Sequence, residues 1–157
     1  MTALLALLLL GPPLVPDARL TPGAVATTNA SDVCRPGYAS AHRTVTLKTK
    51  LAVYDAYGLK PIGRYRTSEA GVRVWQSDYE VDHLISLQLG GSNDPRNLWI
   101  ESYRTPRYNA HAKDALENRL HWLVCVDRSL TLVEAQRTIR VDWIAAYEAF
   151  ITHGPPR

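Results

Sequence analysis

The stretch "YEVDHLISLQLGGSNDPRNLWIE", residues 79–101, holds the side chains whose types and spacing could do chemistry. Asp82 and His83 stand side by side near its start, and an acidic residue beside a histidine can bind a metal ion and accept a proton. Further on, Gly90 and Gly91 interrupt an apolar run where a tight loop would fold the chain back on itself. The stretch therefore predicts two strands joined by a loop, with the Asp-His pair on the first strand.

Three elements must position this pair: a strand over about 80–89, a second strand over 98–101, and a helix that follows them. The helix is predicted to begin with Thr105 as its N-cap and Pro106 at its first position, because these residue types favour helix starts. Leucines at i, i+4 and i+7 would form its buried stripe, namely Leu116, Leu120 and Leu123.

Polar side chains on this helix could complete a site with the strand residues. Asn109, Lys113 and Glu117 recur at four-residue intervals, so they share one face of a helix. One divalent cation held by Asp82 and a helix side chain would polarise a scissile phosphate and stabilise the leaving oxygen. Oxygen ligands favour Mg²⁺ or Mn²⁺, and an added imidazole would admit Zn²⁺ or Ni²⁺. The pattern favours metal-assisted phosphodiester hydrolysis.

The proposed chemistry makes a demand on the first strand. His83 suits a general base that deprotonates water, because the usual pKa of an imidazole lies near neutrality. Neighbouring residues on a regular strand point to opposite faces, so Asp82 and His83 would normally diverge. Both serve one site only if the strand twists or bulges there, or if His83 reaches over the strand edge.

The pattern "EVDHLISLQLGG…RNLW…N…KDALE" resembles the signature of HNH, or ββα-metal, endonucleases. The chain is also similar to a group of small exported bacterial HNH-like proteins through "LTPGA", "VCRPGY", "HAKDALENRLHWLVC" and "DWIAAY", so the likeness spans roughly residues 20–150. This resemblance implies an α+β fold with a ββα-metal hairpin–helix core and additional flanking helices. It also implies that Asp82 is a metal ligand and that His83 activates water.

The resemblance assigns further roles. Asn97 would tie down the loop and help to orient His83 as part of the catalytic set. A helix-borne Asn or His would complete the metal site, and Asn109 is preferred, with His111 as the alternative ligand. The spacing of Asn109 and Glu117 is similar to that in secreted non-specific nucleases of this superfamily, where the Glu holds metal-bound water in the outer shell.

The function predicted on this basis is a metal-dependent endonuclease that acts on DNA, with RNA as an open second substrate. Arg104, Arg107 and Lys113 are predicted to contact substrate phosphates, although a surface role for Lys113 is equally favoured. No helix-turn-helix, zinc finger or basic arm is recognisable, which predicts weak or no sequence specificity. The alternative is a catalytically inactive HNH scaffold that binds nucleic acid or a protein, because a fold does not dictate activity.

The composition suits one globular domain: 157 residues, 46% hydrophobic and 21% charged. Residues 1–18 are predicted to be a signal peptide, although no Lys or Arg precedes Arg19. An extended N-terminal segment over 19–43 and an HNH-like nuclease domain over 44–157 would follow. We therefore expect export to the periplasm or the extracellular space, with no stable membrane association. The net charge of +3 is compatible with an acidic partner but too small to indicate one.

Two cysteines and four tryptophans complete the expectations. In an exported protein, Cys34 and Cys125 most simply form one disulfide, and two free buried thiols are the alternative. The tryptophans are expected in the core rather than as base-stacking surfaces. Two flanking helices are also expected, one over about 45–57 and one that begins with a Thr131–Glu134 capping box and runs to about Phe150.

Overall fold

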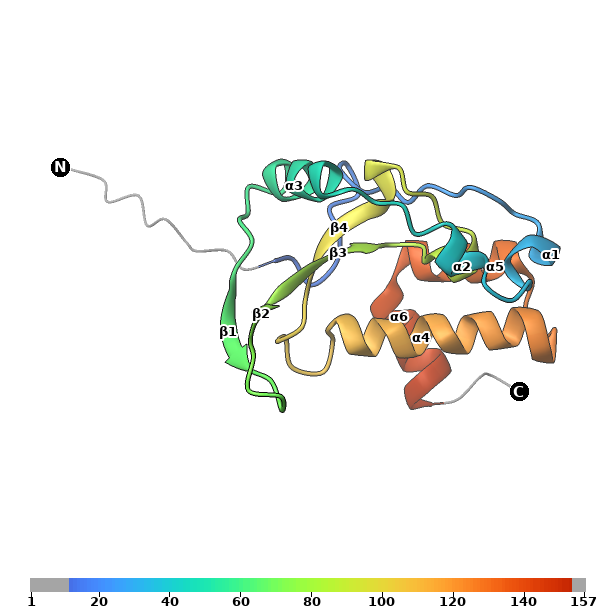
Figure 1. The fold of residues 1–157 in the computed structure, drawn as a ribbon. Coiled ribbons are helices and arrows are strands. Elements are labelled where there is room, and N and C mark those ends of the chain that lie inside the picture. The colour runs from blue at the N-terminus through green and yellow to red at the C-terminus, as the bar shows by residue number, and fades with distance from the viewer. Residues whose placement is uncertain (1–11, 154–157) are drawn as a thin grey trace.

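Within residues 12–153, which this computed structural model describes, helices and two small antiparallel sheets make an α+β fold (Figure 1). The fold class predicted from the sequence is confirmed at this level. Residues 1–11, the larger part of the predicted signal peptide, lie outside the described residues. Within the described part of that predicted peptide, the carbonyl of Leu14 accepts a hydrogen bond from the indole N–H of Trp143 at 3.2 Å.

The Asp-His pair lies on a two-stranded sheet of β3 (Tyr79–His83) and β4 (Leu98–Ser102), which pair antiparallel. The first strand, predicted over 80–89, is shorter than expected, because β3 ends at His83. Two 3-10 turns then lead into β4, η1 (Leu87–Leu89) and η2 (Pro95–Asn97).

The loop between the strands is closed by one buried side chain and one close backbone approach. Asn97 Oδ1 accepts from the N–H of Ile85 at 3.0 Å, and its Nδ2 donates to the carbonyls of Ile85 and Ser92, each at 2.9 Å. A Cβ on Gly91 would lie 1.7 Å from the carbonyl oxygen of Ile85, so only glycine fits there. These contacts bend the chain out of the strand, and they match the loop-tying role expected of Asn97.

The helix after the sheet, α4 (Ala110–Trp122), starts later than predicted. Its N-cap is Asn109, whose Oδ1 accepts a hydrogen bond from the backbone of the first turn at 3.2 Å, and the expectation of Thr105 as N-cap is wrong. Arg107 has a φ of 67°, a left-handed conformation that a right-handed helix cannot include. The helix therefore begins only beyond that residue.

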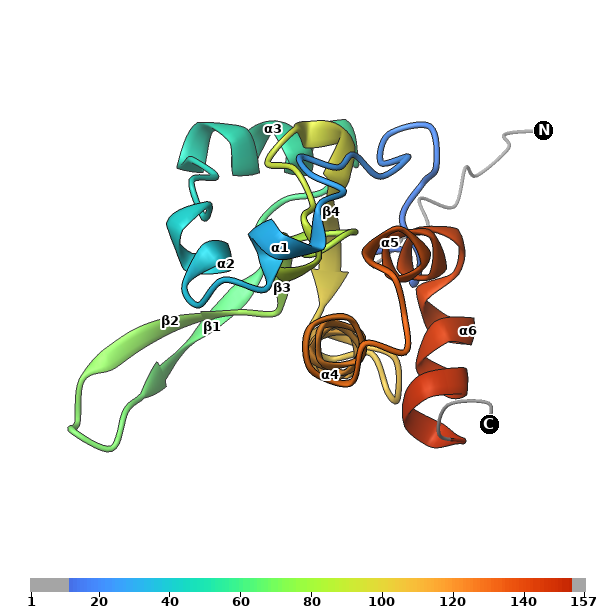
Figure 2. The same cartoon turned by 90° about the vertical axis from the view of Figure 1, so that its right-hand side faces the viewer.

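The sheet lies between two helices, α3 (Leu47–Ala56) on one side and α4 on the other (Figures 1 and 2). Because side chains alternate along a strand, β4 contributes to both layers. One cluster joins α3 to the sheet and contains Val53, Tyr54, Leu98 and Ile100. A larger cluster on the other side contains Trp99 and the predicted leucine stripe, which is buried and thus confirmed, although its last member, Leu123, lies just beyond the end of α4.

The C-terminal part forms two helices, α5 (Leu132–Val141) and α6 (Trp143–Tyr147); α6 packs against α4, and α5 packs against α6. The predicted capping box of Thr131 and Glu134 is present and starts α5. The single helix expected to reach Phe150 is interrupted at Asp142, whose extended backbone ends α5 and whose side chain caps α6. Five-residue π-turns follow α4 and α6, namely η3 (Leu123–Asp127) and η4 (Glu148–Thr152).

The predicted extended segment over 19–43 contains two one-turn helices, α1 (Ala30–Val33) and α2 (Tyr38–Ala41). After α3, a second hairpin of β1 (Gly63–Thr67) and β2 (Arg73–Ser77) projects away from the body (Figures 1 and 2). No helix within residues 12–153 has the length and apolar character that crossing a membrane requires.

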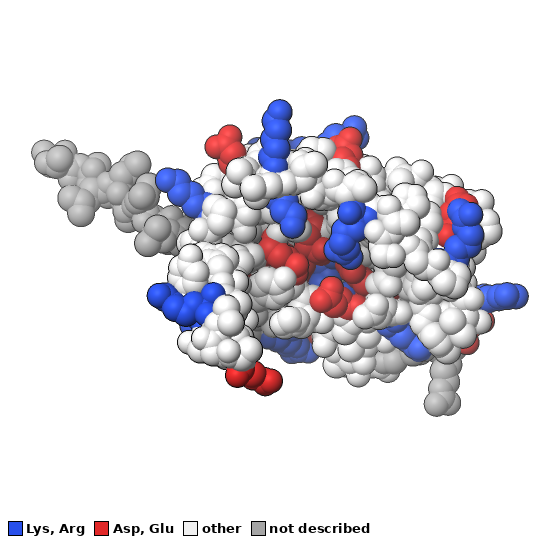
Figure 3. Space-filling view, in the orientation of Figure 1, with Lys and Arg blue, Asp and Glu red and all other residues white. Residues whose placement is uncertain are grey.

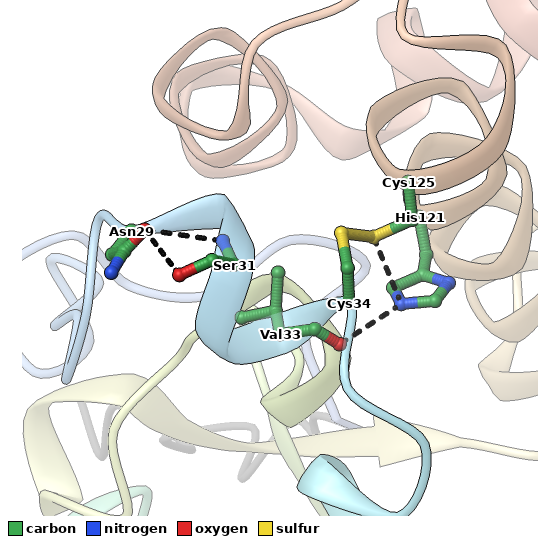
Figure 4. Close-up of a disulfide and its surroundings, with 6 residues drawn as sticks. All are labelled: Asn29, Ser31, Val33, Cys34, His121 and Cys125. Carbon is green, nitrogen blue, oxygen red and sulfur yellow. Dashed lines mark hydrogen bonds between the residues drawn. A yellow bond between two sulfur atoms is a disulfide. The ribbon is translucent and has the colours of Figure 1, made fainter.

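The predicted disulfide is present between Cys34 and Cys125 and joins the segment after α1 to the end of the long helix (Figure 4). The two Cα atoms are 5.3 Å apart. Next to it, the His121 ring lies between the carbonyl of Val33 and the sulfur of Cys125, at 3.3 and 3.4 Å from its Nε2. The presence of a disulfide is compatible with an oxidising compartment.

Candidate functional site

A groove of about 980 Å³ runs along β3 and is lined by all five residues of that strand. Within the described chain β3 pairs with β4 alone, so its other edge faces the groove. Side chains from both faces of the strand therefore reach the same space, and Asp82 and His83 both line it. Figure 3 shows acidic atoms in the hollow of this face and basic side chains around it.

A buried ammonium group joins α4 to the end of β3. Lys113 Nζ donates to Oδ2 of Asp82 at 2.6 Å, to the carbonyl of His83 at 2.7 Å, and to Oε1 of Glu117. Its side chain is only 1% exposed. Lys113 cannot contact a substrate phosphate from this position, so that expectation is corrected.

Charge balance determines which of these groups are ionised. Burial disfavours the charged form of Lys113, but the charge of Asp82, together with the nearby carboxyls of Glu117 and Glu101, outweighs it and holds the pKa of the ammonium well above its usual value. Burial also opposes the charge of Asp82, yet the nearby Lys113 lowers the pKa of that carboxyl overall. The Asp82–Lys113 pair is therefore ionised at neutral pH.

Two further carboxyls, those of Glu101 and Glu117, are also buried, and nearby positive charge offsets the effect of burial on their pKa values only in part. Burial raises the pKa of Glu117 to about 8, because the charge of Lys113 offsets it only in part. Burial raises the pKa of Glu101 to about 9, and neither of its oxygens has a hydrogen-bond partner among residues 12–153. Both groups keep a proton at neutral pH. The sequence interpretation missed Glu101, since a strand-end glutamate carries no signal of burial.

His83 is held by a chain of hydrogen bonds through Asn93. Asn93 Nδ2 donates to the carbonyl of His42 at 2.7 Å and to Thr44 Oγ1 at 2.9 Å, which leaves Oδ1 to face His83 Nε2 at 2.9 Å. Nε2 therefore carries the proton, and Nδ1 is the basic nitrogen of a neutral ring. Burial lowers the pKa of His83, so the ring is neutral at pH 7. Nothing in the sequence around Asn93 indicates this role.

The two predicted helix donors are placed differently. The Asn109 amide is engaged at both atoms, since Oδ1 caps α4 and Nδ2 donates to the carbonyl of Thr105 at 3.0 Å. His111 is exposed and lines the groove, where its ring centroid lies 5.4 Å from that of Tyr103. The structure thus brings His111, rather than Asn109, to the groove that contains Asp82 and His83.

Of the two arginines predicted to bind phosphate, only Arg104 lies at the groove. Arg104 lines the groove and donates from Nε to Asp78 Oδ1 at 2.5 Å. Arg107 is outside the lining and binds both oxygens of Glu148 at 2.9 and 2.8 Å. Other basic residues that line the groove are Arg43, Lys50 and Arg66.

Comparison with known proteins adds no family to this description. No family model matches the chain, and neither a curated protein nor a solved structure matches it. Within the part of the chain that the structure describes, no group of three or more His, Cys, Asp or Glu side chains is arranged to hold a metal ion.

Proposed function

We propose that this protein is a metal-dependent endonuclease of the HNH type that hydrolyses phosphodiester bonds in the groove beside β3. The observation that carries the proposal is the meeting of Asp82 and His83 in one groove with Arg43, Arg66 and Arg104. A carboxylate and a neutral histidine are the groups that hydrolysis needs, and arginines suit a phosphate backbone. DNA is the first expected substrate and RNA the second.

In this proposal His83 is the general base. Its Nε2 is bonded to Asn93, so Nδ1 takes the proton from the attacking water. Because burial lowers the pKa of His83, the base stays in its active, neutral form at pH 7. Asn93 acts as a positioning residue in this scheme, because it sets the ring orientation and the tautomer.

The donor set at the groove fits a cation that needs few protein ligands. Mg²⁺ and Mn²⁺ are commonly bound by one or two carboxylates, with water and substrate phosphate completing the shell. Asp82 is the proposed carboxylate ligand and His111 the proposed helix ligand, in place of Asn109. Burial and then the charge of Asp82 raise the pKa of Glu80, and a cation bound beside the two carboxyls would offset both effects. When bound, the ion would supply Lewis-acid stabilisation of the leaving oxygen.

Glu117 has a different part in this scheme from the outer-shell role implied by the family resemblance. Its carboxyl is bonded to Lys113 and does not line the groove. We assign it to holding the Lys113 ammonium, which in turn orients Asp82. Phosphate contacts are assigned to Arg104, Arg43 and Arg66, because these residues line the groove and Arg107 does not.

One observation favours the second candidate, a scaffold that binds nucleic acid without cutting it. The ammonium of Lys113 already bonds Asp82 and balances its charge from the α4 side. In a protein that does not bind a metal, this internal cation would neutralise Asp82 and hold α4 against the end of β3. The basic and aromatic lining would then serve binding alone.

A plasmid-nicking assay separates the two candidates. Protein purified without reductant is incubated with Mg²⁺, Mn²⁺, Zn²⁺, Ni²⁺ or EDTA, beside His83→Ala and the control His153→Ala. His153 is an exposed histidine outside the groove. The nuclease proposal expects cleavage that requires metal, disappears in His83→Ala and survives in His153→Ala.

Circular dichroism and thermal melting of each variant show whether a silent protein is folded. If folded wild-type protein cleaves neither DNA nor RNA with any of the metals, the binding scaffold becomes the favoured function. Equal cleavage by wild type and His83→Ala would contradict the assignment of His83 as the base.

A further inference from the structure

The β1–β2 hairpin exposes aromatic side chains that the core does not use. Each of its strands pairs only with the other within the described chain, and nearly every residue of both strands is exposed. Tyr65 is 59% exposed and Trp75 is 52% exposed. Trp75 therefore departs from the expectation that the tryptophans lie in the core, as does Trp122, whereas Trp99 and Trp143 are buried. Exposed aromatic residues on a projecting hairpin indicate an interaction surface.

The register of the hairpin orders these rings. Tyr65 lies directly opposite Trp75, and the two rings meet edge to face with centroids 5.2 Å apart. The guanidinium of Arg73 lies 4.8 Å from the centre of the Tyr65 ring. A Cβ on Gly63 would be 2.7 Å from the Trp75 ring, so the absence of a side chain at that position makes room for the indole. Two aromatic rings and an arginine thus share one hairpin face.

The charge of the hairpin favours an anionic partner. Residues 63–77 contain three arginines and one acidic residue, Glu69, which lies in the turn. Arg64 pairs with Asp78 at 3.2 Å, whereas no ion pair of Arg66 or Arg73 occurs among the described residues. Two guanidinium groups therefore remain to meet external phosphates.

The hairpin is also continuous with the groove. Trp75 and Arg66 line the same space as Asp82 and His83. A strand of nucleic acid that contacts the hairpin is therefore directed along β3. Tyr65 and Trp75 are each more than half exposed, which suits contact with bases that are not already stacked in a duplex, and stacking on aromatic rings is tolerant of sequence.

We propose that the Tyr65–Trp75 face of the hairpin is a stacking platform for unpaired nucleotides and delivers a single strand to the groove. The proposal deepens the function proposed above and rests on it for what happens to the strand after binding. It names the substrate class as single-stranded nucleic acid, or duplex with an unpaired segment.

The test measures binding in EDTA, so that cleavage cannot interfere. Fluorescence anisotropy of labelled single-stranded 12-mers, DNA and RNA, is compared with that of the corresponding duplex at one fixed salt concentration. We expect the single strand to bind more tightly than the duplex, and Trp75→Ala to weaken single-strand binding about ten-fold or more. Trp75→Phe keeps a ring and should retain most of the affinity, whereas Trp75→Leu should not.

Trp122→Ala is the matched control. Trp122 is 40% exposed, carries Arg119 at 4.7 Å from its ring centre, and does not line the groove. Its replacement should change the affinity by less than about two-fold, since it repeats the aromatic–arginine pair away from the groove. Tighter binding of the duplex, or equal loss in Trp75→Ala and Trp122→Ala, would overturn the proposal.

The outcomes keep this inference separate from the nuclease proposal. Single-strand binding that depends on Trp75, together with no cleavage under any metal, would overturn the nuclease and retain the platform. Metal-dependent cleavage with Trp75→Ala equal to wild type, in binding and in rate, would overturn the platform and retain the nuclease.

Discussion

The ammonium of Lys113 lies 2.6 Å from Oδ2 of Asp82 and also bonds the backbone carbonyl of His83. One buried cation on α4 thus contacts both members of the pair at the end of β3. It places the Asp82 carboxylate at the groove and fixes the backbone on which the His83 ring is mounted. Helix and sheet are joined here by charge as well as by apolar packing.

Replacement of Lys113 by Met should destabilise the fold strongly. The change leaves the ionised Asp82 without its cation and the Glu117 carboxyl without its hydrogen-bond donor, and breaking a buried ion pair costs about 3–5 kcal/mol. Urea denaturation measures the free energy of unfolding. Lys48→Met on the exposed side of α3 is the control and should change it by less than about 0.5 kcal/mol. A Lys113→Met variant as stable as wild type would mean that the ion pair contributes little.

Asn109→Ala should lower stability but not activity, and His111→Ala should lower activity but not stability. Loss of the Asn109 cap should cost about 1 kcal/mol of unfolding free energy and leave cleavage by the folded protein intact. His111→Ala should keep wild-type stability and lower metal-dependent cleavage at least about ten-fold, because His111 lines the groove. Thermal melts and nicking rates over a Mg²⁺ titration measure both. The reverse pattern would return the ligand role to Asn109.

Stability should fall as the pH rises through the neutral range. The pKa of Glu101 is about 9 in the folded protein, so between about pH 5 and 9 the folded state keeps a proton that the unfolded chain releases. Each such group lowers the unfolding free energy by up to about 1.4 kcal/mol per pH unit. Glu117, with a pKa of about 8, acts in the same direction.

Glu101→Gln tests this pH dependence. The variant should match wild type near pH 5, exceed its stability at pH 8.5, and show a shallower slope between them, as measured by urea denaturation at each pH. Glu69→Gln in the exposed turn of the β1–β2 hairpin is the control and should follow the wild-type curve. Parallel curves for wild type and Glu101→Gln would show that Glu101 ionises normally in the folded protein.

Removal of the disulfide should cost about 4.6 kcal/mol in the chain-entropy model, because Cys34 and Cys125 are separated by 91 residues. The double variant Cys34→Ser/Cys125→Ser and reduced wild type should therefore unfold at similar, lower urea concentrations. Added reductant should leave the double variant unchanged, which controls for other effects of the reagent. An oxidised wild type no more stable than the double variant would contradict the expected contribution.

The sequence by itself determined the features that depend on neighbouring residues. Leu116 and Leu120 are one helical turn apart, so their shared burial follows from helix geometry. The Thr131–Glu134 capping box is equally local and is present. The disulfide was predictable for another reason: the chain contains only two cysteines. The start of α4 was misplaced, because the left-handed conformation of Arg107 has no signature in the sequence.

Only the tertiary structure decided which polar residues meet. Lys113 shares a helix face with Asn109 and Glu117, but whether that face meets water or the end of β3 depends on packing between distant segments. His83 and Asn93 come together because a loop returns the chain to the strand. Both contacts depend on burial, which raises the cost of an unpaired charge or donor and so selects the partners. No local pattern records that selection.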